Sequence, residues 1–88
     1  MTIKYTTQFK KDYKRVKRQN KDLTKIQTLI KKLVSREILG AKYKDHSLTG
    51  SLKGYRDCHI EPDWLVIYKI TQDSLILERT GSHSDLFK

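Results

Sequence analysis

Apolar residues in the first half of the chain recur at helical spacing. Phe9, Tyr13 and Val16 lie at positions i, i+4 and i+7, so they share one face of a helix. A threonine at position 6 or 7 offers a hydroxyl that can cap the first turn of this helix. Residues 3–5, just before it, have the composition of a short strand.

A second apolar stripe follows a polar break at residues 19–22, where Asp22 is placed to cap a helix. The stripe consists of Leu23, Ile26, Ile30 and Leu33, widened by Leu29 and Val34. Gly40 interrupts the pattern soon afterwards. The first half therefore predicts a strand followed by two helices.

The second half changes to the period and the short apolar runs of strands. Residues 42–54 are polar and include two glycines, which predicts a loop with room for a short strand. We expect strands over residues 55–60, 64–70 and 75–80, separated by turns at 61–63 and 72–73. The run 64–70 is almost continuously apolar, which is typical of a central strand. Gly81 ends the last strand and leaves a short tail over 82–87.

The predicted order of elements is βααβββ, which indicates an α+β fold. Two N-terminal helices would pack on one face of a mostly antiparallel sheet. No linker rich in proline or glycine divides the chain, so we expect a single domain over residues 1–88.

Charge is distributed very unevenly between the two halves. The chain carries a formal charge of +9, but residues 1–44 hold 14 basic and 3 acidic side chains, whereas residues 45–88 hold 5 and 7. All 3 histidines lie in the second half. The basic half predicts a polyanionic partner such as nucleic acid, an acidic protein or an anionic membrane surface.

Several classes of protein are excluded by composition. No apolar run approaches the ~20 residues of a membrane-spanning helix. The first residues lack the apolar stretch of a signal peptide. Cys58 is the only cysteine, so neither an intrachain disulfide nor a cysteine zinc cluster can form. These features favour a cytoplasmic protein.

Two residues of the predicted strand 55–60 form the first candidate site. Alternation places Asp57 and His59 on one face, and Cys58 and Ile60 on the face that the helices cover. A carboxylate beside an imidazole can exchange protons and position a phosphate or a hydroxyl. The alternative is that both side chains simply occupy a solvated sheet face.

The other candidate residues lie at strand ends and in loops, where sites tend to be built. Asp63 follows a proline in a turn, and it is either a turn residue, a general base or a carboxylate that orients a histidine. Trp64, beside it, is more typical of the core than of a base-stacking platform. His46 lies in the loop and His83 follows the last strand. Each histidine, taken alone, is equally compatible with a surface position.

Two arginines in the predicted strands have side chains that can hold a phosphate in bidentate fashion. The alternative for Arg56 and Arg79 is an ion pair with Asp57, Asp63 or Glu78. No HxxxH, HxH, GxSxG or glycine-rich phosphate loop occurs, and the histidine spacing gives no support to a metal site. We therefore expect no metal and no cofactor.

The residues of the second half resemble a known family. They are the stretch Tyr43-Lys44-Asp45-His46-Ser47-Leu48-Thr49-Gly50, the stretch Lys53-Gly54-Tyr55-Arg56-Asp57-Cys58-His59-Ile60-Glu61-Pro62-Asp63-Trp64, and then Tyr68-Lys69, Glu78-Arg79-Thr80-Gly81-Ser82-His83 and Leu86-Phe87. This set is similar to the YafQ branch of the RelE/ParE superfamily of bacterial toxins. The likeness runs over residues 43–88, and before them it rests on the helix pattern and the basic charge.

The resemblance implies a RelE-like microbial RNase fold and an endoribonuclease that cuts mRNA in the ribosomal A site. The matching positions imply that His46, His59, Asp63 and His83 are catalytic. Asp57 and Phe87 match further active-site positions, and we assign them to substrate binding together with Arg56 and Arg79. The RelE branch itself works mainly with arginine and lysine, so the histidines point to acid–base chemistry of the YafQ kind.

The resemblance also implies the partners of such a toxin. They are the ribosome with its mRNA and an acidic, DinJ-like antitoxin of the ribbon-helix-helix class, through which the complex would contact operator DNA. Two other functions stay open at this point. One is a non-catalytic module that binds RNA or the ribosome, and the other is a ParE-like inhibitor of DNA gyrase, although that branch lacks this set of histidines.

Overall fold

The computed structural model describes residues 1–87, and its regular elements follow the predicted order with additions. They are β1 (Thr2–Tyr5), α1 (Thr7–Arg18), α2 (Leu23–Val34), the 3₁₀ turn η1 (Ala41–Tyr43), β2 (His46–Ser47), the 3₁₀ turn η2 (Gly50–Leu52), β3 (Arg56–Glu61), β4 (Trp64–Ile70), β5 (Ser74–Gly81) and α3 (His83–Leu86). The predicted α+β class is confirmed. None of the helices in this part of the chain has the length and apolar character needed to cross a membrane.

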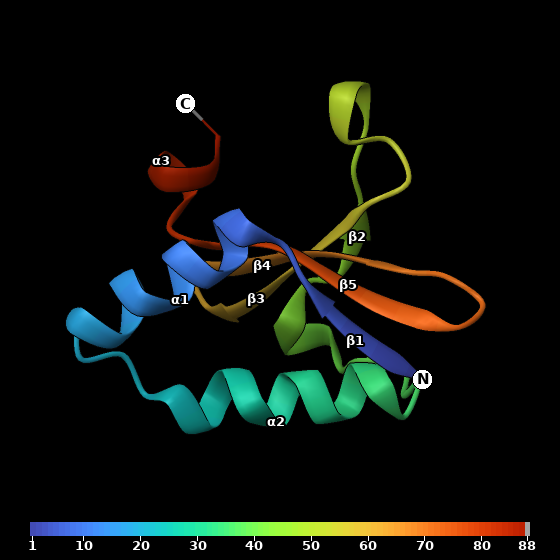
Figure 1. The fold of residues 1–88 in the computed structure, drawn as a ribbon, viewed down its shortest axis with the longest axis horizontal. Coiled ribbons are helices and arrows are strands. Elements are labelled where there is room, and N and C mark those ends of the chain that lie inside the picture. The colour runs from blue at the N-terminus through green and yellow to red at the C-terminus, as the bar shows by residue number, and fades with distance from the viewer. Residues whose placement is uncertain (88) are drawn as a thin grey trace.

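The strands form one sheet in the order β1-β5-β4-β3-β2, in which only β1 pairs in parallel. Tight turns join β3 to β4 and β4 to β5, and a segment with η2 joins β2 to β3. The parallel partners β1 and β5 are the first and last strands of the chain, with the helices and the other three strands between them. Figure 1 shows α2 on one side of the sheet, and α3 with the β2–η2 segment on the other side. One face of the sheet is thus covered by the α2 side of the core. The opposite face, which carries α3, is less covered, and we call it the open face.

The helices begin where the sequence predicts, because polar side chains satisfy their first N–H groups. Thr6 Oγ1 accepts from the Phe9 N–H at 2.9 Å, and Asp22 Oδ1 accepts from the Thr24 N–H at 3.0 Å. The apolar faces then pack on the sheet. The buried core comprises Phe9, Val16, Ile26, Leu29 and Leu33 from the helices with Tyr43, Cys58, Trp64, Val66, Tyr68, Leu75 and Leu77. The predicted inward positions of Cys58 and Trp64 are confirmed.

Side chains of α1 complete the outer edge of β5 beyond the point where β1 ends. The parallel register stops at the pair Tyr5–Leu77. Beyond it, Thr6 Oγ1 donates to the Glu78 carbonyl at 2.9 Å, and Asp12 Oδ2 accepts from the Thr80 N–H at 3.2 Å. Arg15 Nη2 donates to the Thr80 carbonyl at 2.8 Å. Backbone groups that would otherwise be buried without partners are satisfied, which lets β5 continue to Gly81.

The predicted loop contains the short strand for which the sequence left room: this strand, β2, pairs with the start of β3. The two 3₁₀ turns η1 and η2 go beyond the sequence-based prediction. The predicted tail forms α3, which has a capping box in which Ser82 and Asp85 satisfy each other's backbone N–H groups at 3.2 and 3.0 Å. Glycine suits position 81, because an added Cβ would lie 3.1 Å from Asp85 Cβ and 2.5 Å from Arg15 Nη2, which would have to move from the Thr80 carbonyl.

Candidate active site

The open face of the sheet receives candidate side chains from β2, β3 and the segment that begins α3. Alternation along β3 turns Cys58 into the core and presents Asp57 and His59 on the opposite face. The pairing of β2 with β3 places His46 directly across from Asp57. Residues that the sequence separates by 10 or more positions are in this way brought together.

His46 has a defined tautomer in this arrangement. Its Nδ1 lies 2.9 Å from the Lys44 carbonyl oxygen and 3.1 Å from Asp57 Oδ1. Both neighbours are hydrogen-bond acceptors, so Nδ1 must carry a proton. In the neutral ring Nε2 is then an unprotonated nitrogen, which can take up a proton.

Asp57 is nearly buried, with 3% of its surface exposed. Its Oδ1 receives no well-directed hydrogen bond within residues 1–87, since the Nδ1–H of His46 is better aligned with the Lys44 carbonyl. Burial raises the pKa of Asp57, while the fields of His46, His59 and His83 oppose that increase. The alternative of a solvated sheet face is therefore wrong for this residue.

His83 is held by Asp63 across 20 positions of sequence. Asp63 Oδ1 accepts from the His83 backbone N–H at 2.8 Å and lies 2.7 Å from His83 Nδ1. These two hydrogen bonds lower the pKa of Asp63, the backbone one most strongly. An ionised carboxylate only accepts, so Nδ1 carries the proton and the opposite nitrogen, Nε2, is free to act on a substrate. The geometry is that of a carboxylate orienting a histidine.

His59 completes the cluster. Its ring centroid lies 5.4 Å from that of His83, with the rings 72° apart in an edge-on arrangement. Partial burial lowers the pKa of His59; His83, Lys44 and His46 lower it further, and Asp57 acts in the opposite direction. The three imidazoles and the Asp57 carboxylate thus lie within electrostatic reach of one another, and Asp63 joins the cluster through His83.

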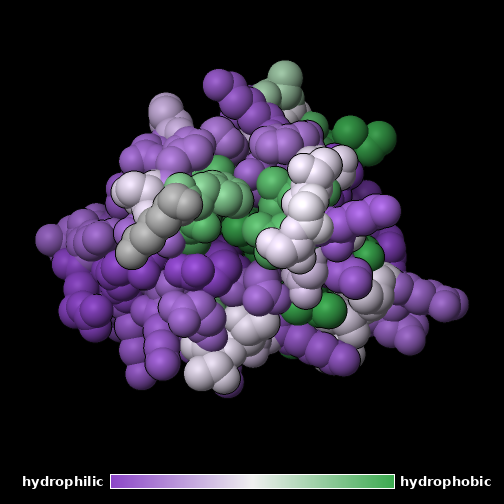
Figure 2. Space-filling model, turned by 90° about the horizontal axis from the view of Figure 1, so that it is seen from above, coloured by the Kyte–Doolittle hydropathy of each residue, from purple (hydrophilic) through white to green (hydrophobic). Residues whose placement is uncertain are grey.

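The surface around this cluster mixes apolar and polar character. Figure 2 looks onto the face that carries α3 and shows apolar surface gathered near its middle, with hydrophilic side chains around it. Phe87, at the end of α3, is 40% exposed. Its backbone N–H donates to the His83 carbonyl at 2.7 Å, and an exposed aromatic ring at this point of the chain is suited to stacking on a nucleic-acid base.

The predicted ion-pair partners of the two arginines are wrong. Arg56 points to the helical side of the sheet, where Asp45 accepts from its Nε at 3.3 Å. Arg79 shares the open face with Asp57 by register, since both pair with Ile67. Its Nε and Nη2 nevertheless turn to Asp12 of α1, at 2.6 and 3.3 Å. Arg56 therefore does not join the cluster, and Arg79 lies at its margin.

The sequence-based prediction missed two carboxylates, Asp45 and Asp12, that hold the backbone near the site residues in place. Asp45 accepts from the Tyr68 hydroxyl at 2.6 Å and so fixes the backbone immediately before His46. Asp12 is fully buried and holds β5 just before His83. One signal for Asp12 was available, because it lies between Phe9 and Val16 on the face of α1 that packs inward. Within residues 1–87 no group of three His, Cys, Asp or Glu side chains is arranged to hold a metal ion.

Comparison with known proteins agrees with this architecture. A family model described as "Bacterial toxin of type II toxin-antitoxin system, YafQ" matches residues 1–88. The chain belongs to the YafQ family of type II toxins. The predicted family is thereby confirmed.

Similar YafQ proteins are known in sequence and in structure. The mRNA interferase toxin YafQ of Escherichia coli K12 is 49% identical over 86 residues, which is 97% of this chain and 94% of that protein. The crystal structure of YafQ from E. coli BL21(DE3) superposes with a TM-score of 0.94 at 47% identity, covering 98% of this chain and 97% of that one. YafQ in the E. coli DinJ-YafQ toxin-antitoxin complex superposes with a TM-score of 0.92 at 48% identity, covering 98% and 96%.

Proposed function

We propose that this YafQ-family toxin is a ribosome-dependent endoribonuclease that cleaves mRNA in the A site and so stops translation and growth. The name mRNA interferase, borne by the E. coli relative at 49% identity, supports the enzymatic class. The observation that carries the mechanism is the fixed orientation of His83 by Asp63 beside His46, His59 and buried Asp57.

RNA supplies its own nucleophile in this reaction, the 2′-hydroxyl of the ribose. A base removes the hydroxyl proton, O2′ bonds to the adjacent phosphorus, and the bond from phosphorus to O5′ breaks. An acid gives its proton to the departing O5′, so the products are a 2′,3′-cyclic phosphate and a 5′-hydroxyl. Imidazoles suit both roles because their ordinary pKa lies near neutral pH. The proposed chemistry needs no metal and no cofactor.

We assign the general acid to His83 and the general base to His46, through the Nε2 atom of each. Asp63 already accepts two hydrogen bonds from His83, which favours an orienting role over that of a base. His59 and Asp57 position the phosphate and the ribose in this scheme. Nη1 of Arg79 is the guanidinium nitrogen that Asp12 leaves unused, and it is suited to stabilise charge on the phosphorane.

Phe87 is assigned to stacking on a base of the message, which would keep O2′, phosphorus and O5′ in line. Arg56 is omitted from the mechanism because its side chain lies on the other face of the sheet.

The partners follow from charge and from the relatives. An acidic, DinJ-like antitoxin fits a chain of net charge +9, and E. coli YafQ crystallises with DinJ. Ribosomal RNA is the second polyanion that the basic helices would contact, in a salt-dependent way. Contact with operator DNA would come only through the antitoxin complex.

A purified translation system tests this function. We expect the toxin to cut a defined message in register with the reading frame, as mapped by primer extension, and only when ribosomes translate it. His83→Ala should reduce cleavage by about 10²–10⁴-fold. The control, Ser84→Ala, changes the neighbouring residue of α3 and should cleave like the parent.

Parent-like cleavage by His83→Ala would show that His83 is not the acid. A parent protein that cuts no message under any condition would overturn the enzymatic proposal, and a gyrase supercoiling assay on the same sample would test the ParE-like alternative.

A further inference from the structure

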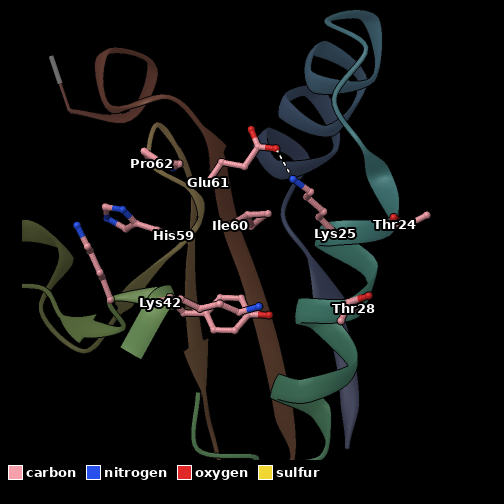
Figure 3. Close-up of a pocket in the computed structure, with 10 residues that line it drawn as sticks. Thr24, Lys25, Thr28, Lys42, His59, Ile60, Glu61 and Pro62 are labelled. Carbon is pink, nitrogen blue, oxygen red and sulfur yellow. Dashed lines mark hydrogen bonds and ion pairs between the residues drawn. The ribbon is translucent and has the colours of Figure 1, made fainter. Parts of the chain in front are cut away.

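A groove lies beside the catalytic cluster, along the outer edge of β3, and charged side chains line part of it. Strand β2 pairs with Arg56 and Asp57, and no other strand within residues 1–87 covers the rest of that edge. The opening, which we call the β3-edge groove, has a volume of about 460 Å³ and lies between Thr24, Lys25 and Thr28 of α2, Lys42 and Lys44 at η1, and His59. Figure 3 shows His59 and Lys42 across from the α2 side chains.

The charged side chains that line this groove differ in whether they already form salt bridges within the protein. Lys25 donates to Glu61 at 2.9 Å, and Lys21 lies 3.9 Å from the same carboxylate, so the negative charge of Glu61 is balanced within the protein. The salt bridges found within residues 1–87 involve neither Lys42 nor Lys44. Lys42 Nζ lies 5.2 Å from the centre of the Tyr43 ring, a contact that leaves its charge available to a ligand.

The groove is continuous with the catalytic cluster through His59. That histidine lines the groove and also packs edge-on against His83. Lys44 is close enough to His59 for its charge to lower the pKa of the imidazole. A phosphate held by Lys44 would therefore be a near neighbour of one held at the histidines.

We propose that the β3-edge groove holds the phosphates of the message strand that adjoin the scissile bond, with Lys42 and Lys44 as the binding cations. This inference rests on the proposed function. The two ammonium groups can neutralise phosphates of single-stranded RNA, and the two threonine hydroxyls can donate hydrogen bonds to them. A groove that binds such a strand needs positive charge and hydrogen-bond donors along the path of the RNA backbone. An acidic antitoxin segment is the competing occupant, and continuity with His59 favours RNA.

The test measures how binding of a fully 2′-O-methylated RNA oligonucleotide, which has no nucleophile and cannot be cleaved, depends on salt. Fluorescence anisotropy of the parent and of Lys42→Gln/Lys44→Gln would be recorded from low to moderate ionic strength. We expect the variant to lose about 1.4 from the slope of log K against log salt, because each phosphate contact contributes about 0.7 on single strands. The charge-preserving Lys42→Arg/Lys44→Arg should keep the parental slope.

The matched control is Lys4→Gln/Lys69→Gln, which removes the same charge from β1 and β4, outside both the groove and the basic helices, and should keep the parental slope. Equal slopes for the two Gln variants, or no measurable RNA binding by the parent, would overturn the proposal. It would also be overturned if Lys42→Gln/Lys44→Gln kept the RNA slope and lost affinity for the antitoxin. Cleavage by the parent on translating ribosomes is scored separately, so that failure of the groove and failure of the proposed function can be told apart.

Discussion

Asp12 is the charged residue whose removal should most disturb this fold. Its carboxylate is 0% exposed and joins α1 to the end of β5. It accepts from Arg79 Nε at 2.6 Å, from Arg15 Nη1 at 3.0 Å and from the Thr80 N–H at 3.2 Å. Asp12→Ala would leave the buried Thr80 N–H without a partner and Arg79 without its counter-charge. Arg15 would keep Asp85 at 3.6 Å.

The magnitude follows from these contacts. Removing one partner of a fully buried ion pair costs about 3–5 kcal/mol. That range is an upper bound for Asp12, because the side chains of Arg79 and Arg15 are 28% and 27% exposed and water can solvate them. An unpaired buried N–H costs about 1–3 kcal/mol. We expect a loss of about 2–4 kcal/mol, which lowers the Tm of a domain this small by roughly 10–25 °C.

The same carboxylate should make stability depend on pH in acid. Burial alone would raise the pKa of Asp12, but hydrogen bonds from Arg79, Gln8 and the Thr80 N–H outweigh it and lower the pKa below its ordinary value of 3.8. A lowered folded-state pKa means stabilisation that is complete above the unfolded value and is lost as pH falls through the folded value. Asp12→Asn should lack this component.

Thermal and urea denaturation followed by circular dichroism would measure the effect, in a His83→Ala background chosen to lower toxicity to the expression host. Asp73→Ala is the control, since it changes an aspartate in the β4–β5 turn and should stay within about 0.5 kcal/mol of its parent. If Asp12→Ala also stays within that margin, the hydrogen bonds to β5 do not stabilise the fold and the reasoning is refuted.

Three further predictions concern the site itself. Asp57→Asn should raise the Tm at pH 7 while cleavage falls about 10²-fold; a lowered Tm would contradict this. The reason is that a buried carboxylate with a raised pKa destabilises the fold increasingly as pH rises from its unfolded pKa through its folded pKa, and Asn lacks this charge. In NMR titrations the His59 imidazole should titrate below its ordinary pKa of 6.5, and Lys44→Gln should move that pKa upward; no movement would mean that the Lys44 charge does not reach the ring. Tyr68→Phe removes the hydroxyl that donates to Asp45 at 2.6 Å and should lower kcat more than affinity for RNA, with parental kcat as the contrary result.

The sequence by itself determined the elements whose signals are local. The spacing of Phe9 and Val16 predicted the buried face of α1, and the apolar run 64–70 predicted β4 with its observed bounds. Alternation along β3 correctly separated inward Cys58 from Asp57 and His59. These features depend on backbone periods of 3.6 and 2.0 residues, which any stretch of sequence displays directly.

Only the tertiary structure decided which side chains meet. Asp63 reaches His83 across 20 positions of sequence, and Asp12 reaches Arg79 across 67. Such pairs depend on strand order and register and on where a helix lies against a strand edge, and no local pattern encodes these. The same cause lies behind the wrong partners predicted for the arginines. Local patterns indicated which polar side chains lie outside the core and are available for chemistry. Long-range packing decided that Asp63 and Asp57 are the carboxylates that lie against the histidines.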